Sequence, residues 1–418
     1  MQVTEIASAI AAGRVSALEV LDDHLARIEA RNPELNAIVV EDFERARAAA
    51  AEPRPGPLRG VPFTVKEAID TAGLPACEAS RLRPVETPAR DAPAVAALRE
   101  AGAILIGKTN ISELCAHPDS SNLVYGATRN PVDPSRSACG SSGGEGAAVG
   151  AGLSAFGIGS DYGGSIRAPA HFCGIAGMRP GLGRVPSAGH LPRVQPPARA
   201  YWSTIGPLAR SVSDLELVMS VLAGEPLGGA ALPRRVWIYR DSLDRPLEAC
   251  CNAAVEEAGS RLPVEILDAT PPFQLEAERL YESLSAAETR EIIEGLGPLD
   301  EASPHLLSIW EMVRSAPPAR FEAGVVSELE ARASIWLDEH PVLLCPAAAS
   351  PAFELGYGDP GVFDLFHHCK LASALGLPAA VVPVSTSPEG LPVGVQIVGR
   401  RGREDEVLAV ARAIERGA

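Results

Sequence analysis

Lysine is the scarcest charged residue of the sequence: among 37 lysines and arginines in 418 residues, only Lys66, Lys108 and Lys370 are lysines. Arginine keeps its proton because its pKa exceeds ~12, so it cannot serve as a base at neutral pH, whereas a buried lysine can lose its proton. Because so few lysines are present, each one is a candidate functional amine.

Excess positive charge and long apolar runs are also missing. The formal net charge is −16, which argues against nucleic acid or an anionic membrane as the main partner. No stretch approaches the ~20 apolar residues that a membrane-spanning helix needs. The start, MQVTEIASAIAAGRVSALEV, has an early acidic residue and no apolar run of signal-peptide length. We therefore expect a cytoplasmic protein that does not bind a membrane.

The patterns of metal sites and disulfide frameworks are absent as well. The eight cysteines show no C-x-x-C spacing, and most lie among apolar or small residues, which is typical of reduced core thiols in a cytoplasmic protein. The eight histidines form no ligand motif, and His367 and His368 are an isolated pair. We therefore expect no metal site.

Predicted strands and helices alternate along the whole sequence. Size alone would allow two or three domains, but alternation without a linker or internal repeat favours one large α/β sandwich over residues 1–418. Strands are predicted at 36–40, 61–67, 103–106, 236–239, 264–267, 342–346, 379–382 and 393–398. Helices are predicted at 3–12, 16–31, 41–51, 91–102, from 109, at 207–224, 362–375 and 404–416. In 225–340, the least informative part, we expect a variable, mainly helical region that faces the substrate.

The most informative stretch is 137–184. It holds two glycine-framed serine clusters, 140–144 (GSSGG) and 161–165 (DYGGS), and the small-residue run between them predicts a helix and then a strand. Glycine permits positive φ and close approach to a ligand, so each cluster places a hydroxyl beside bare amide N–H groups. A site that attacks a carbonyl carbon needs this pairing of nucleophile and oxyanion donors. One cluster alone is typical of an ordinary turn, but two around one α/β unit favour catalysis.

Two familiar motifs occur in the wrong context. Residues 102–109 match the P-loop pattern G-x-x-x-x-G-K-T, but the four variable positions are themselves a predicted strand, so no turn remains to cradle a phosphate. Residues 140–144 match the G-x-S-x-G nucleophile elbow centred on Ser142, but a Pro-rich polar loop precedes them where that elbow needs a strand. Neither nucleotide binding nor an α/β-hydrolase triad is favoured.

The segments around Lys66 and the two serine clusters resemble the amidase signature family. The similarity covers LRGVPFTVKEAID (58–70), GAILIGKTNISEL (102–114), the whole of 139–184, GPLARSVSDLELV (206–218), GLPAAVVPV (376–384) and GLPVGVQIVG (390–399). These segments occur in the family's order and make up most of the chain outside 225–340. The central motif is long, so the resemblance is specific.

The resemblance implies a single α/β/α domain around a mixed central β-sheet, and hydrolysis of linear amides by a Ser-Ser-Lys triad without cofactor or metal. By motif, Ser165 in DYGGSIR corresponds to the nucleophile that forms an acyl-enzyme. Ser141 corresponds to a bridging serine that follows a cis peptide bond, and Lys66 in VKEAID corresponds to the base. Burial would lower the pKa of Lys66 from ~10.4 towards ~7, because desolvation disfavours the ammonium.

The same motifs imply the supporting parts of the site. The oxyanion hole is implied to consist of backbone amides, those of Tyr162, Gly163, Gly164 and Ser165. Ser142 is a supporting residue next to the bridging serine. Asp161 and Arg167 are expected to hold the loop rather than touch the substrate.

The sequence departs from the family's usual pattern at four positions, none of which carries a catalytic side chain. Cys139 stands where a glycine is usual, Glu145 where a serine is common, Tyr162 where the residue is usually small, and Ser373 where asparagine is frequent. Tyr162 is expected to narrow the acyl pocket. The motifs therefore do not identify the amide.

Two other functions remain open. The first is the amidase-like subunit of a glutamine-dependent tRNA amidotransferase, but that branch usually has glutamine directly after the arginine of SIR, where this chain has Ala168, and the chain is short for it. The second is a pathway-specific, non-hydrolytic partner, against which an intact Lys66, Ser141 and Ser165 weigh. The expected partner is a small-molecule amide, with no nucleic acid and no membrane, and a homodimer is left open.

Overall fold

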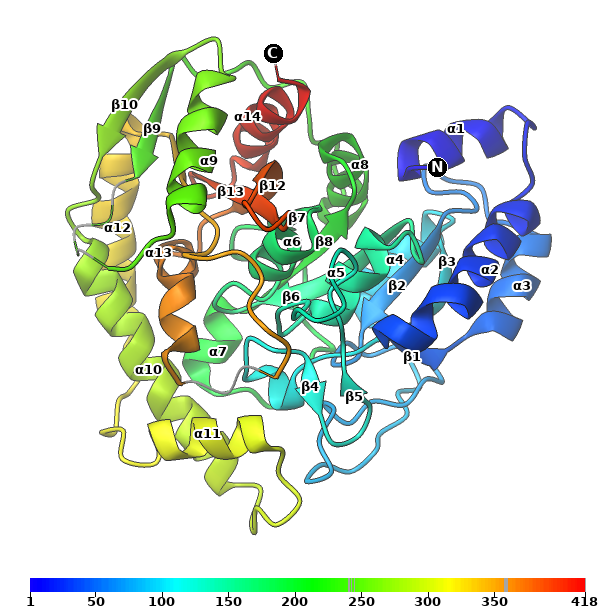
Figure 1. The fold of residues 1–418 in the computed structure, drawn as a ribbon, viewed down its shortest axis with the longest axis horizontal. Coiled ribbons are helices and arrows are strands. Elements are labelled where there is room, and N and C mark those ends of the chain that lie inside the picture. The colour runs from blue at the N-terminus through cyan, green and yellow to red at the C-terminus, as the bar shows by residue number, and fades with distance from the viewer. Residues whose placement is uncertain (240, 242, 244, 357–359, 418) are drawn as a thin grey trace.

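The computed structural model describes residues 1–239, 241, 243, 245–356 and 360–417 (Figure 1). The strands of its main sheet are β1 (Ile38–Glu41), β2 (Pro62–Lys66), β3 (Ile104–Thr109), β6 (Phe156–Asp161), β7 (Ala176–Arg179), β8 (Thr204–Ala209), β9 (Arg235–Tyr239), β10 (Glu265–Ala269), β11 (Val342–Pro346), β12 (Ala379–Thr386) and β13 (Pro392–Gly399). A separate pair is formed by β4 (Ser121–Asn122) and β5 (Gly126–Ala127).

The α-helices are α1 (Val3–Ala11), α2 (Ala17–Leu35), α3 (Phe43–Ala51), α4 (Pro93–Glu100), α5 (Gly143–Gly150), α6 (Arg167–Cys173), α7 (Pro197–Trp202), α8 (Val212–Ala223), α9 (Ala249–Ser260), α10 (Gln274–Glu294), α11 (Pro304–Val313), α12 (Ala323–Glu339), α13 (His367–Ala374) and α14 (Glu404–Arg416). Residues Glu113–Cys115 and Pro360–Phe366 form 3-10 helices. None of the helices in the described part of the chain has the length and apolar character needed to cross a membrane.

Within the described residues, the main sheet has eleven strands in the order β1-β3-β2-β6-β8-β7-β12-β13-β11-β9-β10. It is mixed, because β2 runs parallel to β3 and β6, and β9 runs parallel to β10 and β11, while the remaining neighbours are antiparallel. The sheet crosses the whole molecule, from the N-terminal helices at one edge to β10 at the other (Figure 1).

The central strands of the sheet are buried on both faces, whereas the edge strand β10 is largely exposed. In β11, Val342 and Leu344 belong to one apolar cluster while Leu343 and Cys345 belong to another, because successive side chains of a strand point to opposite faces. The first cluster includes side chains from α1 to α6, α8, α9 and α14, and the second includes side chains from α7, α10, α12 and α13. Helices thus cover both faces, which confirms the predicted α/β sandwich with a mixed central sheet.

The functional segments come together because neighbouring parallel strands end at the same edge of a sheet. Strand β2 pairs in parallel with β6 through Val65 and Ile158, so Lys66 at the end of β2 lies near the second serine cluster, which begins at the end of β6. Helix α5 begins at Gly143, within the first cluster, and contacts both strands. The helix and strand predicted between the two clusters are confirmed as α5 and β6.

Several predicted elements were wrong. The helix expected from residue 109 is only the short 3-10 turn at Glu113–Cys115, because Leu114 and Cys115 have φ of 56° and 55°, which an α-helix cannot contain. The helix expected at 207–224 begins later: residues up to Ala209 form β8, and α8 starts after Ser211, whose hydroxyl accepts the Asp214 amide. Strand β7 was also missed, and the first half of the helix expected at 362–375 is a 3-10 helix.

Candidate active site

Lys66 and Ser141, predicted from motifs 75 residues apart, are in direct contact. The Nζ of Lys66 lies 2.6 Å from Ser141 Oγ, 2.9 Å from Ser160 Oγ and 3.5 Å from the Ser160 carbonyl oxygen. The Lys66 side chain is fully buried, and Ser141 is 2 % exposed. Burial lowers the pKa of Lys66, against the raising influence of the Cys115 thiol and the Asp161 carboxylate. Burial therefore makes the neutral, proton-accepting form of this amine more accessible than it is in water.

The first serine cluster has the backbone that the resemblance implies. The peptide bond between Gly140 and Ser141 is cis. The amide of Ser142 donates to the carbonyl oxygen of Ser165 at 3.2 Å, and Ser142 Oγ lies 3.3 Å from the carbonyl oxygen of Ser160, to which it donates. Ser142 thus links the first serine cluster to the second and to the end of β6. This places Ser142 where it supports the site.

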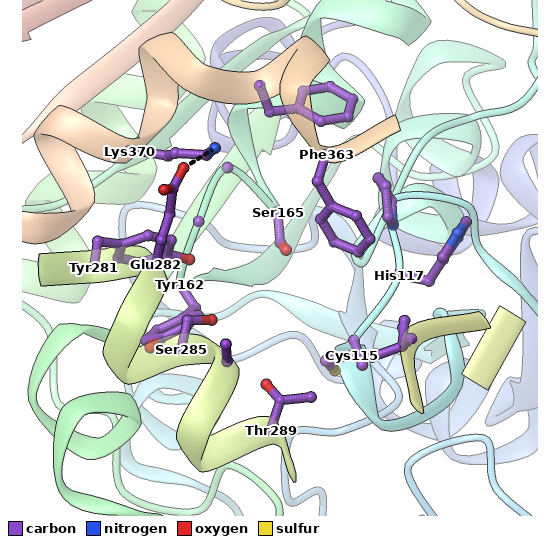
Figure 2. A pocket seen from close by; sticks show the side chains of 18 of the residues that line it. Cys115, His117, Tyr162, Ser165, Tyr281, Glu282, Ser285, Thr289, Phe363 and Lys370 are labelled. Atoms are coloured by element: carbon purple, nitrogen blue, oxygen red, sulfur yellow. Dashed lines mark hydrogen bonds and ion pairs between the residues drawn. The ribbon is translucent and has the colours of Figure 1, made fainter. Parts of the chain in front are cut away.

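Ser165 lies in the wall of a cavity of about 590 Å³. Figure 2 shows its side chain between Phe363 on one side and Tyr281 and Glu282 of α10 on the other. An ion pair of 2.6 Å joins Glu282 to Lys370, the third lysine. The remaining lining is largely apolar and aromatic, including Ala116, Tyr162, Ala168, Ala286, Ile309, Met312, Val313 and Phe366.

Residues 162–165, the turn predicted to bind the oxyanion, line the same cavity, and two positions of this turn favour glycine. A Cβ on Gly163 would lie 2.2 Å from the Tyr281 hydroxyl, and Gly164 has φ of +127°, where a side chain is strained. The amide of Gly164 donates to Asp161 Oδ1 at 2.9 Å. Gly164 is therefore engaged within the turn, so it is the least available of the predicted oxyanion donors.

Asp161 and Arg167 stabilise the 162–165 turn through hydrogen bonds, and neither side chain lines the cavity. Arg167 donates to Asp161 with Nη2 at 2.8 Å and with Nε at 3.0 Å, and both side chains are fully buried. The guanidiniums of Arg167 and Arg179 keep the pKa of the Asp161 carboxyl well below its usual range despite burial. Arg167 also donates to Ser373 Oγ at 2.9 Å, so the serine found in place of the family's frequent asparagine supplies an acceptor.

Two other departures have a structural explanation. Cys139 has φ of +66°, a conformation that favours the glycine usual at this position. Glu145 is fully buried and accepts hydrogen bonds from Thr64 at 2.6 Å and Thr109 at 2.7 Å. Burial raises the pKa of Glu145 to about 8, so its carboxyl group is mainly protonated at neutral pH.

Tyr162 contributes to an aromatic wall of the cavity. Its ring centroid lies 5.1 Å from that of Tyr281 and 6.4 Å from that of Trp202, and the Arg199 guanidinium lies 5.8 Å from the ring centroid. Tyr162 therefore forms part of the cavity wall, and its narrowing of the acyl pocket stays a prediction.

Sequence reasoning missed three groups beside the predicted residues. Ser160 contacts Lys66, Cys115 lines the cavity, and His190 contacts Ser160 at 2.7 Å. Ser160 directly precedes DYGGS, so its position next to the cluster was a usable signal, whereas nothing in the local sequence marks His190. In the described residues, no group of three or more His, Cys, Asp or Glu side chains is arranged to hold a metal ion.

The fold and the buried pair of Lys66 and Ser141 define an α/β protein of the amidase kind, and comparison with known proteins gives the family. Residues 19–228 and 306–408 match the family described as Amidase. The chain belongs to the amidase signature family of amide hydrolases. The unmatched residues 229–305 contain α10, which lines the cavity.

Curated relatives and a solved structure agree with this membership. The chain is 32% identical to an indoleacetamide hydrolase of Bradyrhizobium diazoefficiens, over 98% of this chain and 85% of the relative. It is also 32% identical to a glutamyl-tRNA(Gln) amidotransferase subunit from Chloroflexus aurantiacus, over 100% of this chain and 96% of the relative. A crystal structure of an amidase has a TM-score of 0.86 and 31% identity, covering 100% of this chain and 99% of the other.

Proposed function

We propose that the protein hydrolyses the carboxamide C–N bond of a small, linear amide through an acyl-enzyme on Ser165. The observation that carries this proposal is the buried contact of 2.6 Å between Lys66 Nζ and Ser141 Oγ. The residue after Ser141 is hydrogen-bonded to the carbonyl oxygen of Ser165, which lines a cavity of ligand size. A neutral amine next to a hydroxyl can accept a proton, and a second hydroxyl can pass its own proton to the first.

In the first half of the reaction, Ser165 Oγ forms a bond to the carbonyl carbon of the amide. Its proton moves to Ser141 Oγ as the proton of Ser141 moves to Lys66, which becomes an ammonium. The carbonyl oxygen gains the electron pair and is stabilised by backbone N–H donors of the 162–165 turn. Because the Gly164 amide donates to Asp161, we assign this role chiefly to the amides of Tyr162, Gly163 and Ser165.

In the second half, the C–N bond breaks and the proton returns from Lys66 through Ser141 to the leaving nitrogen. The amine departs and leaves an ester on Ser165. Water then loses a proton to the same relay and attacks the ester carbonyl, and Ser165 regains its hydroxyl when the acid departs. The relay restores every proton, and no step needs a cofactor.

The cavity supports a mainly apolar acyl group. Its volume of about 590 Å³ lies within the usual range for small-molecule sites, ~300–1,000 Å³. Its walls include aromatic and aliphatic side chains from α10, α11 and the Pro360–Phe366 helix, so we infer that residues 225–340 take part in substrate selection.

The eight free cysteines are our reason for assigning the activity to the cytoplasm, where thiols stay reduced.

A hydrolase is favoured over an amidotransferase component by one residue of the cavity. Ala168 lines the cavity and stands where the amidotransferase branch usually has glutamine, so a polar side chain is missing next to the nucleophile. Intact Lys66, Ser141 and Ser165 also weigh against a non-hydrolytic partner. A glutaminase assay distinguishes an amide hydrolase from an amidotransferase component, because an amidotransferase component of this kind releases ammonia from glutamine.

The test is covalent labelling with a serine-directed fluorophosphonate together with turnover on a panel of aryl and alkyl amides. The unmodified protein and Ser142→Ala should be labelled on Ser165, and Ser165→Ala should be neither labelled nor active. Ser154→Ala is a matched control, because this buried serine donates to the Phe156 carbonyl away from the cavity. An unmodified protein that is neither labelled nor active on any amide would overturn the proposal.

A further inference from the structure

The surroundings of Lys66 contain a hydroxyl and a histidine that have no part in the proposed proton relay. Ser160, the residue of β6 before Asp161, has its Oγ 2.9 Å from Lys66 Nζ and 2.7 Å from His190 Nε2. The other ring nitrogen of His190, Nδ1, contacts the carbonyl oxygen of Leu191. A continuous chain of hydrogen bonds therefore runs from Ser141 through Lys66 and Ser160 to His190.

The carbonyl at the far end fixes the direction of each hydrogen bond. A carbonyl oxygen only accepts, so Nδ1 of His190 carries the ring proton. A neutral imidazole protonated at Nδ1 has an acceptor at Nε2, so the Ser160 hydroxyl donates to the ring. The Ser160 oxygen then offers only its lone pairs to Lys66, which is the donor in that contact. The side-chain amide of Gln195 lies 3.5 Å from Nδ1, a longer contact than that with the carbonyl.

His190 is held against the segment that follows Lys66. The amide of Asp70 donates to the Gly189 carbonyl at 2.7 Å, and the Leu191 amide donates to the Ala68 carbonyl at 2.8 Å. His190 itself forms an antiparallel bridge with Ile69. These bonds position the imidazole relative to Lys66 through the backbone, independently of the serine between them.

The ring stays neutral in this position. Burial lowers the pKa of His190 to about 3, and the nearby charges of Lys66 and Arg199 act in the same direction. The protonated ring would donate at both nitrogens, which would reverse the hydrogen bond from Ser160. Near neutral pH the ring is therefore a fixed acceptor.

The hydrogen bonds to Ser160 determine the direction in which the lone pair of Lys66 points. A neutral amine has two N–H groups and one lone pair, and Ser160 supplies two acceptors, its Oγ at 2.9 Å and its carbonyl oxygen at 3.5 Å. The Cys115 thiol is a further side-chain hydrogen-bond partner of the amine. With one N–H group directed at Ser160 Oγ and the other at the Ser160 carbonyl oxygen or the Cys115 sulfur, the lone pair faces Ser141 Oγ at 2.6 Å. We propose that His190, acting through Ser160, is a positioning residue that aims the lone pair of Lys66 at Ser141. This inference rests on the proposed function, in which Lys66 is the base.

Without the imidazole, the Ser160 hydroxyl is free to rotate and donate to the amine. It would then compete with Ser141 for the lone pair and stabilise the neutral amine. The other titratable or charged groups that act on Lys66 are Cys115, Asp161, Glu145 and Arg199. All of them remain in place in a His190 variant, so a change in the pH profile reports on the hydrogen-bond chain.

The test compares His190→Leu, His190→Gln, Ser160→Ala and the double variant His190→Leu/Ser160→Ala on an amide that the unmodified protein hydrolyses. We expect His190→Leu to lower kcat by about tenfold, the effect of losing one buried hydrogen bond, with little change in KM. The acidic limb of its kcat/KM profile should move to lower pH. His190→Gln, which keeps an acceptor oxygen, should recover most of the rate. In the Ser160→Ala background, His190→Leu should lower kcat little further, because His190 acts on Lys66 only through Ser160.

His24→Leu is the control for loss of a hydrogen-bonded imidazole elsewhere in the protein. His24 is 1 % exposed, contacts the Val20 carbonyl at 2.8 Å and lies on α2 away from the cavity, so its variant should keep the rate and the pH profile. Additive losses in the double variant, or an unchanged pH limb in a folded His190→Leu, would overturn the positioning role. An unmodified protein without amide hydrolysis or labelling would instead refute the proposed function.

Discussion

The amine nitrogen of Lys66 lies 2.6 Å from the hydroxyl oxygen of Ser141, and the lysine side chain has no exposed surface. An ammonium in such a place has lost its hydration and gains little in return, because its closest partners are neutral hydroxyls. Burial makes the amine a better base, and it also lowers the free energy of unfolding of the protein. Two substitutions of Lys66, by arginine and by methionine, separate these consequences.

Replacing Lys66 by arginine should abolish proton transfer, because a guanidinium stays protonated. We expect kcat/KM to fall by about 10²–10⁴-fold, the usual contribution of a general base. In the unmodified enzyme kcat/KM should rise with pH until the lowered pKa of Lys66 is passed and then level off. The pH profile of amide hydrolysis checks both expectations, and near-normal turnover in Lys66→Arg would remove Lys66 from the mechanism.

Lys66→Met should be inactive but more stable than the unmodified protein. The folded-state pKa of Lys66 lies below its ordinary value of 10.5, so the unfolded chain binds more protons and the stability of the unmodified protein rises with pH. The stability gained by the methionine variant should therefore grow as the pH falls from 10 to 7. Urea unfolding at several pH values measures the gain, and equal stability of the two proteins at every pH would contradict it.

Gly163→Ala should lower the rate of acylation, because its Cβ would lie 2.2 Å from the Tyr281 hydroxyl and displace the oxyanion turn. We expect a loss of about 10–100-fold in kcat/KM, comparable to misplacing a catalytic group by about 1 Å. Removing the hydroxyl with Tyr281→Phe leaves the next ring atom at 3.2 Å, so the double variant should recover part of the rate. Tyr281→Phe alone is the control. A double variant no faster than Gly163→Ala would show that the clash is not the cause.

Glu145→Gln should change how stability depends on pH. The folded-state pKa of Glu145 is raised from 4.5 to about 8, so between these values the folded protein binds more protons than the unfolded chain. Stability is therefore lost as the pH rises through this window, by about 1 kcal/mol per pH unit. The glutamine variant should lack this loss and become relatively more stable towards pH 8. Unfolding free energies from pH 5 to pH 8.5 test this, with exposed Glu100→Gln as the control.

The core of the site could be predicted from the sequence because its parts lie in contiguous motifs. Lys66 ends a buried strand, and the two serine clusters surround one helix and strand, so each candidate had a local signal. The parallel pairing of β2 and β6 brings Lys66 close to the serine clusters, and this pairing was not predicted from the sequence.

The parts that the sequence did not predict depend on distant contacts or on special backbone angles. His190 reaches Ser160 because its segment pairs with residues 68–70, and no local pattern encodes that pairing. The positive φ of Leu114 and Cys115 prevents the helix predicted from residue 109. The end of the cavity formed by α10 and α11 lies in the stretch with the weakest motifs, so its geometry appears only in three dimensions.

Helices α10 and α11 should select the acyl group of the substrate. Ala286 on α10 lines the cavity of about 590 Å³ together with Ile309 and Met312 of α11. Ala286→Leu would fill part of this space, and a lost or blocked methylene contact in an apolar pocket is worth about 10–200-fold in specificity. We expect kcat/KM to fall by that order for amides with bulky acyl groups and to change little for acetamides. Ser283→Leu, at an exposed position of the same helix, should leave both unchanged. Equal losses on short and bulky amides in Ala286→Leu would mean that this end of the cavity does not hold the acyl group.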